Sequence, residues 1–246
     1  MNSHTAEHLF HGALADEYHF LQRICPAAAE MSQRVGEYVE HLPPRPDGCA
    51  LELLELGCGT GITTRHLLNS RDDLRIVSLD NAPAMLAQAR VNLAEALANG
   101  RLELRESDAL SALETLADDS MEVVASAYTL HNFLSGYRTR VLAEILRVLK
   151  PGGLFVNGDR YAIDEPAAHL QHTQEEVRGY FRVFLEMQRP DLLKQWVVHL
   201  FSDESEEHLM RLHPALEEMV ALGFAEVRVN FRNGVNALVS GRKPWR

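Results

Sequence analysis

The sequence has few cysteines and no long hydrophobic run. Its three cysteines are an odd number without a C-x-x-C pair, which argues against a disulfide framework and against a thiolate metal site. No stretch approaches the roughly 18 consecutive apolar residues that a membrane span needs. Charged residues and histidines interrupt residues 1–21, so this segment lacks the apolar centre of a signal peptide. We therefore expect a cytoplasmic protein with no membrane partner.

Positive charge is also scarce. The chain has 24 Lys and Arg residues against 35 Asp and Glu residues, for a formal net charge of −11. Nucleic acids and anionic membranes bind to surfaces on which Lys and Arg cluster. The composition therefore argues against a nucleic-acid partner and favours a small molecule or a protein as substrate, with a monomer or a homodimer as the expected state.

The most informative stretch is an apolar run that ends in glycines at alternate positions, Gly57, Gly59 and Gly61. This pattern predicts a strand, a tight turn and a helix over 62–69. Glycine has no Cβ, so a ligand can lie against bare backbone, and the N–H groups of such a turn form a polar cradle. The spacing differs from G-x-G-x-x-G, and no Lys-Ser or Lys-Thr follows. We therefore expect a ligand that is not strongly phosphorylated.

A second signal lies about twenty residues beyond the glycines. The next predicted strand, 74–79, ends at Asp80. In an open α/β sheet, a carboxylate at this place can accept hydrogen bonds from the two hydroxyls of a ribose. The glycines and Asp80 together favour a cofactor that contains adenosine.

Four motifs in this order resemble those of the class I S-adenosylmethionine-dependent methyltransferases. They are E-L-G-C-G-T-G at 55–61, L-D-N-A-P-A-M-L at 79–86, S-D-A at 107–109 and L-K-P-G-G at 149–153. The resemblance is good over roughly residues 35–160 and adequate for the C-terminal strands, whereas residues 1–35 and 161–212 match no motif. It implies S-adenosyl-L-methionine as the cofactor.

The resemblance also implies roles for single residues. Glu55 and Gly57 would flank the methionine part of the cofactor, and Asp80 would bind the ribose. Asp108 would accept from the adenine amino group, with a helix cap as the alternative. Met85 would pack on the adenine or in the core. The predicted cofactor-binding residues are Glu55, Gly57, Cys58, Gly59, Asp80, Asn81, Met85, Asp108, Ala109, Ser126 and His131.

Strands alternate with helices from residue 50 to residue 157, which predicts parallel pairing with crossover helices. The Asn233-Gly234 pair predicts a hairpin between the last two strands. We expect an α/β fold with a doubly wound, seven-stranded, mostly parallel sheet whose last strand is antiparallel. The single domain, 1–246, would divide into an N-terminal helical cap (1–46), a cofactor-binding core (47–160), a helical insertion or lid (161–212) and a final helix with two strands (213–246).

Some local boundaries follow from the same patterns. Residues 83–99 and 138–149 are expected to be helices. The insertion is expected to be helical from 166 to about 201, with a break near Pro190, and the acidic residues 203–207 are expected to begin a further helix.

His131, Asp159 and Tyr161 are candidates for catalysis, and Arg160 is a candidate for substrate binding. His131 follows the fourth predicted strand and could act as a general base, with packing around the cofactor as the alternative. After the fifth strand, Asp159 could orient an amine, Arg160 could hold a carboxylate and Tyr161 could stack on a ring. The alternative for these three is a surface Asp–Arg pair beside a packed tyrosine. Tyr18 and Arg23 are further candidates for closing over the cofactor.

No metal is predicted. His169 and His172 lie one helical turn apart, but the sequence offers no H-E-x-x-H motif and no evident third ligand. A polar helix face is the preferred interpretation of this pair.

We therefore expect an S-adenosylmethionine-dependent methyltransferase that acts on a small molecule by in-line methyl transfer. Two alternatives remain open: an enzyme that uses the sulfonium cofactor differently, to make a carboxymethylated cofactor or without consuming the methyl group, and a non-catalytic binding scaffold. Nucleic-acid methylation is disfavoured because no N-P-P-Y or D-P-P-Y motif follows the fourth strand.

Overall fold

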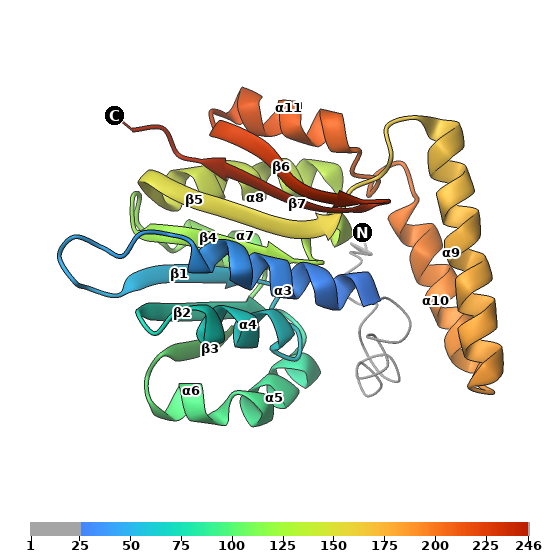
Figure 1. Cartoon of the computed structure of the whole chain (residues 1–246), viewed down its shortest axis with the longest axis horizontal. Coiled ribbons are helices and arrows are strands. Elements are labelled where there is room, and N and C mark those ends of the chain that lie inside the picture. Colours follow the sequence, from blue (N-terminus) through green and yellow to red (C-terminus); the bar gives the residue numbers. More distant parts are fainter. Residues whose placement is uncertain (1–25, 246) are drawn as a thin grey trace.

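A seven-stranded sheet forms the centre of the computed structural model, which describes residues 26–245 (Figure 1). The strand order is β3-β2-β1-β4-β5-β7-β6. The strands are β1 (Leu51–Leu56), β2 (Leu74–Asp80), β3 (Leu102–Glu106), β4 (Met121–Ala127), β5 (Leu149–Arg160), β6 (Ala225–Asn233) and β7 (Asn236–Arg242). Strands β1 to β5 pair in parallel, and β7 pairs antiparallel with both β5 and β6. The predicted fold class is confirmed.

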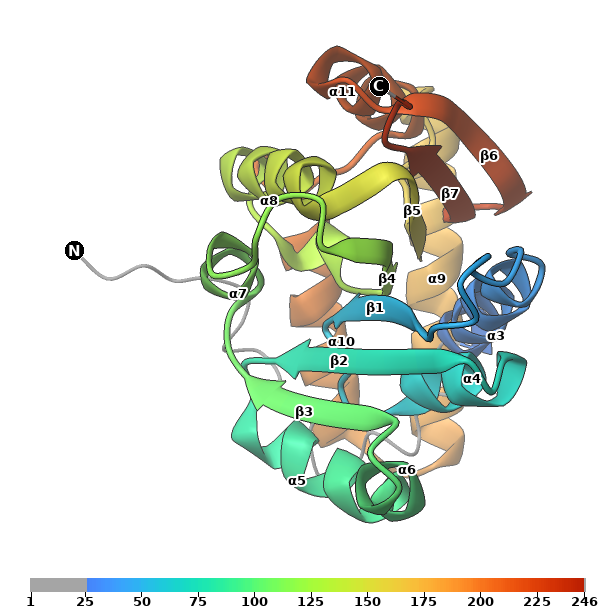
Figure 2. The same ribbon diagram turned by 90° about the vertical axis from the view of Figure 1, so that its left-hand side faces the viewer.

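Helices cover both faces of the sheet (Figure 2). One face packs on α3 (Pro26–Glu40), α4 (Ile62–Ser70) and α5 (Pro83–Asn92), and the short α6 (Ala94–Ala98) follows α5. The other face packs on α7 (Ala109–Glu114), α8 (Ser135–Val148) and α11 (Leu212–Leu222). With apolar layers on both sides, the central strands are apolar along almost their whole length, as Leu53, Leu54 and Leu56 of β1 illustrate with exposures of 1% or less.

The chain reverses its direction of winding between β1 and β4. From β1 it moves outward through β2 to β3, and then returns to pair β4 on the other side of β1. Open α/β sheets bind ligands beyond the carboxyl ends of the strands at such a switch point. The loops after β1 and β4 therefore lie where a ligand crevice is expected.

Two local predictions differ from the structure. The helix expected over 83–99 is two helices, because Leu93 leaves the helical conformation with φ −122° and ψ 23°. The segment 203–207 does not begin a helix: Asp203 ends α10, and the chain then turns, with Ser205 bonded to His208 at 2.8 Å.

Two long helices connect β5 to the last part of the sheet, α9 (Pro166–Glu186) and α10 (Pro190–Asp203). Figure 1 shows them side by side at one end of the sheet. Glu165 caps α9 by accepting the N–H groups of Ala167 and Ala168, and Pro190 begins α10. The pair has a small apolar core of its own around Phe184 and Leu192. Among residues 26–245, no helix is long and apolar enough to cross a membrane.

Candidate cofactor and active site

Close contacts with other parts of the chain require glycine at two positions of this loop. Gly57, Gly59 and Gly61 have φ values of 68°, 53° and 90°, a region that favours glycine. A Cβ on Gly57 would lie 2.2 Å from Oγ1 of Thr129, and a Cβ on Gly61 would lie 2.6 Å from Cδ1 of Leu93. Gly57 thus lets the loop after β4 come against the turn, whereas Gly61 lets α4 pack against the break between α5 and α6.

A pocket opens beside this loop at the carboxyl ends of β1, β2 and β4. It holds about 780 Å³ of space, including the part open to solvent. Its lining combines the glycine loop, two strand-end aspartates and the loop after β4. The lining residues are Gly57, Gly59, Leu79, Asp80, Asn81, Ala82, Met85, Ser107, Asp108, Ala109, Ala127, Tyr128, Thr129, Asn132 and Phe133.

Asp80 ties β2 to the glycine loop. Its Oδ2 accepts the N–H of Gly59 at 2.8 Å, and its Oδ1 accepts the N–H of Ala82 at 2.9 Å. Burial raises the pKa of Asp80, although these backbone donors oppose the shift. An ionised carboxylate has about four acceptor positions, so the side chain retains capacity for the hydroxyls of a ribose.

Asp108 serves as a helix cap and also lines the pocket. Its Oδ1 accepts the N–H of Ser111 and the hydroxyl of Tyr137, each at 3.0 Å. Burial alone would raise the pKa of Asp108, but these donors outweigh it and the pKa is lowered. Because both bonds use Oδ1, the cap leaves Oδ2 available, so the two interpretations of Asp108 are compatible.

Four residues of the predicted cofactor set do not line the pocket: Glu55, Cys58, Ser126 and His131. Glu55 is fully buried, with Oε2 accepting from Thr64 at 2.7 Å and from Ser78 at 2.5 Å. Burial raises the pKa of the Cys58 thiol, which fits a packing residue and not a thiolate nucleophile. Ser126 is buried and donates to the carbonyl of Leu56. Contact of these residues with the cofactor stays a prediction.

The buried carboxyl group of Glu55 should make the free energy of unfolding depend on pH. Burial raises its pKa to about 7, from 4.5, so the folded protein keeps this proton in a range where the unfolded chain has lost it. The free energy of unfolding should therefore fall as pH rises between these values, by at most about 3 kcal/mol. Glu55→Gln carries no such proton and should remove this fall. Denaturant unfolding of both proteins across pH 4 to 8 checks it; parallel curves would contradict the assignment.

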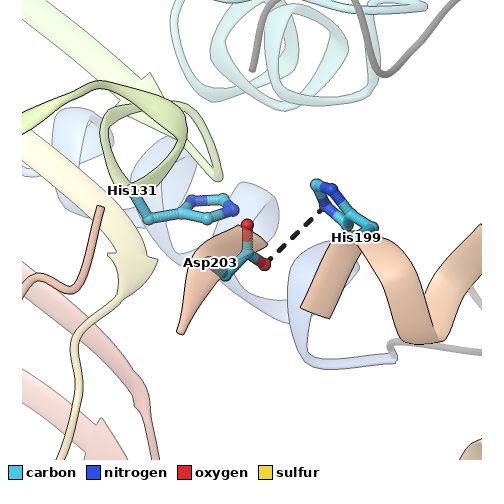
Figure 3. A group of neighbouring side chains, drawn as sticks. All are labelled: His131, His199 and Asp203. Atoms are coloured by element: carbon cyan, nitrogen blue, oxygen red, sulfur yellow. Dashed lines mark ion pairs between the residues drawn. The ribbon is translucent and has the colours of Figure 1, made fainter. Parts of the chain in front are cut away.

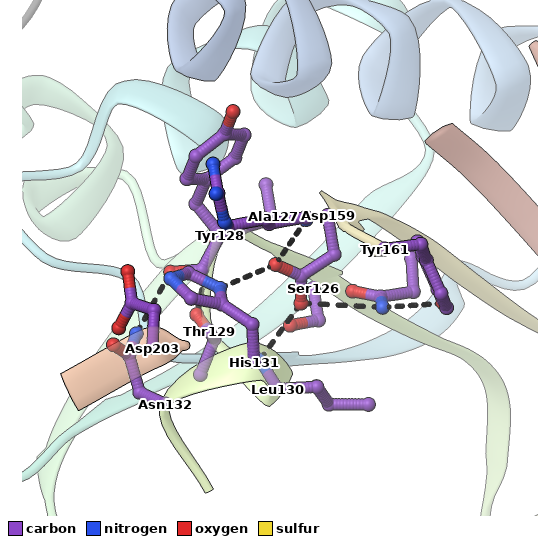
Figure 4. A network of polar contacts seen from close by, with 12 residues as sticks. Ser126, Ala127, Tyr128, Thr129, Leu130, His131, Asn132, Asp159, Tyr161 and Asp203 are labelled. Atoms are coloured by element: carbon purple, nitrogen blue, oxygen red, sulfur yellow. Dashed lines mark hydrogen bonds and ion pairs between the residues drawn. The ribbon is translucent and has the colours of Figure 1, made fainter. Parts of the chain in front are cut away.

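A buried polar network lies behind the loop after β4 (Figure 4). Asp159, at the end of β5, is 0% exposed. It accepts from Nδ1 of His131 at 2.6 Å and from the backbone N–H groups of Leu130 and Arg160 at 2.8 Å. The carboxylate thus fixes both the imidazole and the single 3₁₀ turn Leu130–Asn132, whose neighbours Thr129 and Phe133 line the pocket.

His131 and Asp159 each favour the charged form of the other. Burial lowers the pKa of His131, but the adjacent Asp159 outweighs burial and holds it above its usual value. Burial would raise the pKa of Asp159, but the contact with His131, together with hydrogen bonds from the Arg160 backbone and the Asn157 side chain, lowers it instead. The two side chains therefore form a buried ion pair.

The other candidates at the end of β5 form hydrogen bonds inside the protein. The surface Asp–Arg pair is wrong: Asp159 is buried, and the guanidinium of Arg160 bonds to Glu176 and Glu204 at 2.7–2.8 Å. Tyr161 is 2% exposed, as expected of a packed tyrosine, with its hydroxyl accepting from Asn157 at 2.9 Å. A direct catalytic contact by Tyr161 stays a prediction.

The remaining candidates lie elsewhere. Tyr18 and Arg23 fall outside the described residues. On α9, His169 is buried and bonds to Glu204 at 2.7 Å, so it does not belong to an open polar face, while His172 lies 4.0 Å from Glu176.

A family model described as a methyltransferase domain matches residues 54–157, which contain the glycine loop and both strand-end aspartates. The chain contains a class I S-adenosylmethionine-dependent methyltransferase domain. Its cofactor is S-adenosyl-L-methionine. The residues present fit this group, because the two strand-end carboxylates and the bare backbone at Gly57 meet in one pocket.

Similar proteins with this domain have different activities. Carboxy-S-adenosyl-L-methionine synthase of Escherichia coli is 23% identical over 211 residues, which cover 83% of this chain and 81% of the relative. An O-methyltransferase family protein from Burkholderia thailandensis superposes with a TM-score of 0.66 at 17% identity, covering 96% of this chain and 62% of that one. The cyclase SpnF superposes with a TM-score of 0.57 at 16% identity, covering 87% and 81%. These structural likenesses establish the fold alone.

Proposed function

We propose that this protein transfers the methyl group of S-adenosylmethionine to a small-molecule acceptor. The observation that carries the proposal is the convergence of Gly57, Asp80 and Asp108 on one pocket. In this proposal Asp80 binds the ribose and Asp108 with Ala109 binds the adenine. The methionine part lies along the glycine loop, next to the loop after β4.

The loop after β4 would form the acceptor side of the pocket. Tyr128, Asn132 and Phe133 line it there. The sulfonium group of the cofactor makes its methyl group electrophilic, so the protein has to align the acceptor and exclude water. Asp159 and His131 serve this alignment by holding the turn that carries Asn132.

The charge of the chain supports a small-molecule acceptor over a nucleic acid. The net charge of −11 opposes nucleic-acid substrates.

Synthesis of a carboxylated cofactor is the second candidate, because the Escherichia coli relative carries that name. Recognition of the added carboxylate by the protein would use a Lys, Arg or His side chain at the pocket. The described residues that line the pocket include Asp80 and Asp108 but no Lys, Arg or His. This lining favours methyl transfer.

Two measurements test the proposal. Calorimetric titration should show S-adenosylmethionine binding at millimolar concentration or below, and incubation with a panel of small hydroxyl, amine and thiol compounds should yield S-adenosylhomocysteine together with a methylated product by mass spectrometry. A carboxylated cofactor as the product would establish the second candidate instead. Tight binding without turnover on the panel would favour a scaffold.

A further inference from the structure

Three potential metal ligands meet in the protein interior, although the sequence separates them. His131 lies after β4, and His199 and Asp203 lie one turn apart at the end of α10. One ligand atom from each lies within 4.8 Å of the other two (Figure 3). The side chains are only 7%, 10% and 8% exposed.

The two imidazole rings are held in position. Nδ1 of His131 is bonded to Asp159 at 2.6 Å, and Nε2 becomes the ligand atom when an incoming metal displaces the proton that the imidazolium carries there. Figure 3 shows this edge of the ring directed toward the Asp203 carboxylate. Metal-binding histidines commonly have a carboxylate on their second nitrogen, which fixes the tautomer and the ring orientation. His199 packs edge-on against Trp196, with ring centroids 5.9 Å apart.

Asp203 provides an independent observation that points to a ligand. Its Oδ1 is buried and has no hydrogen-bond partner among residues 26–245. Its Oδ2 lies 3.7 Å from Nε2 of His199, beyond hydrogen-bond distance. A buried carboxylate without hydrogen bonds is costly unless a cation compensates it.

We propose that His131, His199 and Asp203 bind one divalent transition-metal ion of the zinc type. Two imidazole nitrogens and one carboxylate oxygen are the ligands of many catalytic zinc and iron sites, whereas Mg²⁺ and Ca²⁺ prefer oxygen ligands alone. Tetrahedral bonds of about 2.0–2.1 Å place ligand atoms about 3.3 Å apart. The 3.7 Å between His199 and Asp203 is close to that spacing, and all three ligand atoms lie within 4.8 Å of one another, so a closure of up to about 1.5 Å completes the site.

The proposed metal would have an open coordination position near the acceptor side of the pocket. The Tyr128 ring, which lines the pocket, contacts the His131 ring edge-on at 5.4 Å between centroids. An acceptor with an oxygen or nitrogen donor could occupy the open position and lose its proton more readily there. This consequence rests on the proposed methyl transfer, whereas the metal site itself does not.

Metal binding is tested on the full-length protein after removal of metals with a chelator. Equilibrium dialysis against Zn²⁺, followed by metal analysis, should show one more equivalent in the wild type than in Asp203→Asn or His199→Ala. The matched control is His41→Gln, which removes an exposed histidine and should bind as much as the wild type. The measured quantity is the difference in bound Zn²⁺ between the wild type and each variant, because residues 1–25 contain further histidines that can bind Zn²⁺.

Two further measurements exclude a folding defect. Asp203→Asn keeps the shape of the side chain, so its melting temperature without metal should stay close to that of the wild type, while added Zn²⁺ should raise only the wild-type value. Co²⁺ should give visible absorption bands that both variants lack. Equal Zn²⁺ content in wild type and variants would overturn the proposal. A wild-type protein that bound Zn²⁺ but not S-adenosylmethionine would contradict the proposed function and leave the metal site intact.

Discussion

Asp80→Ala is expected to weaken S-adenosylmethionine binding by about 100-fold or more. Each hydrogen bond to an ionised group contributes about 1.5–3 kcal/mol, and each 1.4 kcal/mol corresponds to a factor of ten in affinity. Loss of two ribose hydroxyl contacts therefore removes at least about 3 kcal/mol. The same substitution leaves the N–H groups of Gly59 and Ala82 without their acceptor, which loosens the loop that surrounds the cofactor.

Calorimetric titration of both proteins measures this loss. The matched control is Asp73→Ala, which removes an aspartate that precedes β2 at the opposite end of the strand, is paired with Arg71 and is 36% exposed. It should bind the cofactor like the wild type. Unfolding curves without ligand establish that both variants are folded. If Asp80→Ala retained full affinity, the placement of the ribose would be wrong.

The residues that line the pocket were predictable because their signals are local. Gly57 follows β1, Asp80 ends β2 and Asp108 lies two residues after β3. The ends of neighbouring parallel strands meet at one edge of the sheet. The residue types at these places limit what they can bind. Sequence alone was therefore sufficient to locate the pocket.

The direction of individual side chains was less predictable. Ser126 does not line the pocket, whereas its neighbour Ala127 does. Successive residues of a strand point to opposite faces, so adjacent positions of one strand differ in whether they line the pocket. The Glu55 carboxylate is held inside the core by Thr64 and Ser78, and no local pattern in the sequence records these contacts.

Contacts between distant segments could not be predicted. His131 and Asp159 were each named as candidates, but not as a pair, because their contact depends on β4 and β5 lying side by side. Asp203 was assigned to the start of a helix and lies at the end of one. Its proximity to His131 depends on how α10 packs against the sheet, and no sequence spacing records this packing.

Asp159→Ala is expected to lower the free energy of unfolding by about 3–5 kcal/mol, the usual cost of breaking a buried ion pair. The substitution leaves the buried His131 ring and two backbone N–H groups without their acceptor. Since domains are stable by only about 5–15 kcal/mol, this loss is a large fraction of the total. Urea denaturation with a chelator present measures it and keeps any bound metal out of the comparison.

The chain provides a matched exposed pair as the control. Asp164 accepts from Nδ1 of His213 at the same distance of 2.6 Å and also from its backbone N–H, but the two side chains are 36% and 76% exposed. Water can replace these contacts, so Asp164→Ala should cost about 1 kcal/mol or less. The difference between the two losses of unfolding free energy measures how much burial adds to an aspartate–histidine contact of the same length. Equal losses would mean that Asp159 does not hold the turn that carries Asn132, and that His131 keeps its position without it.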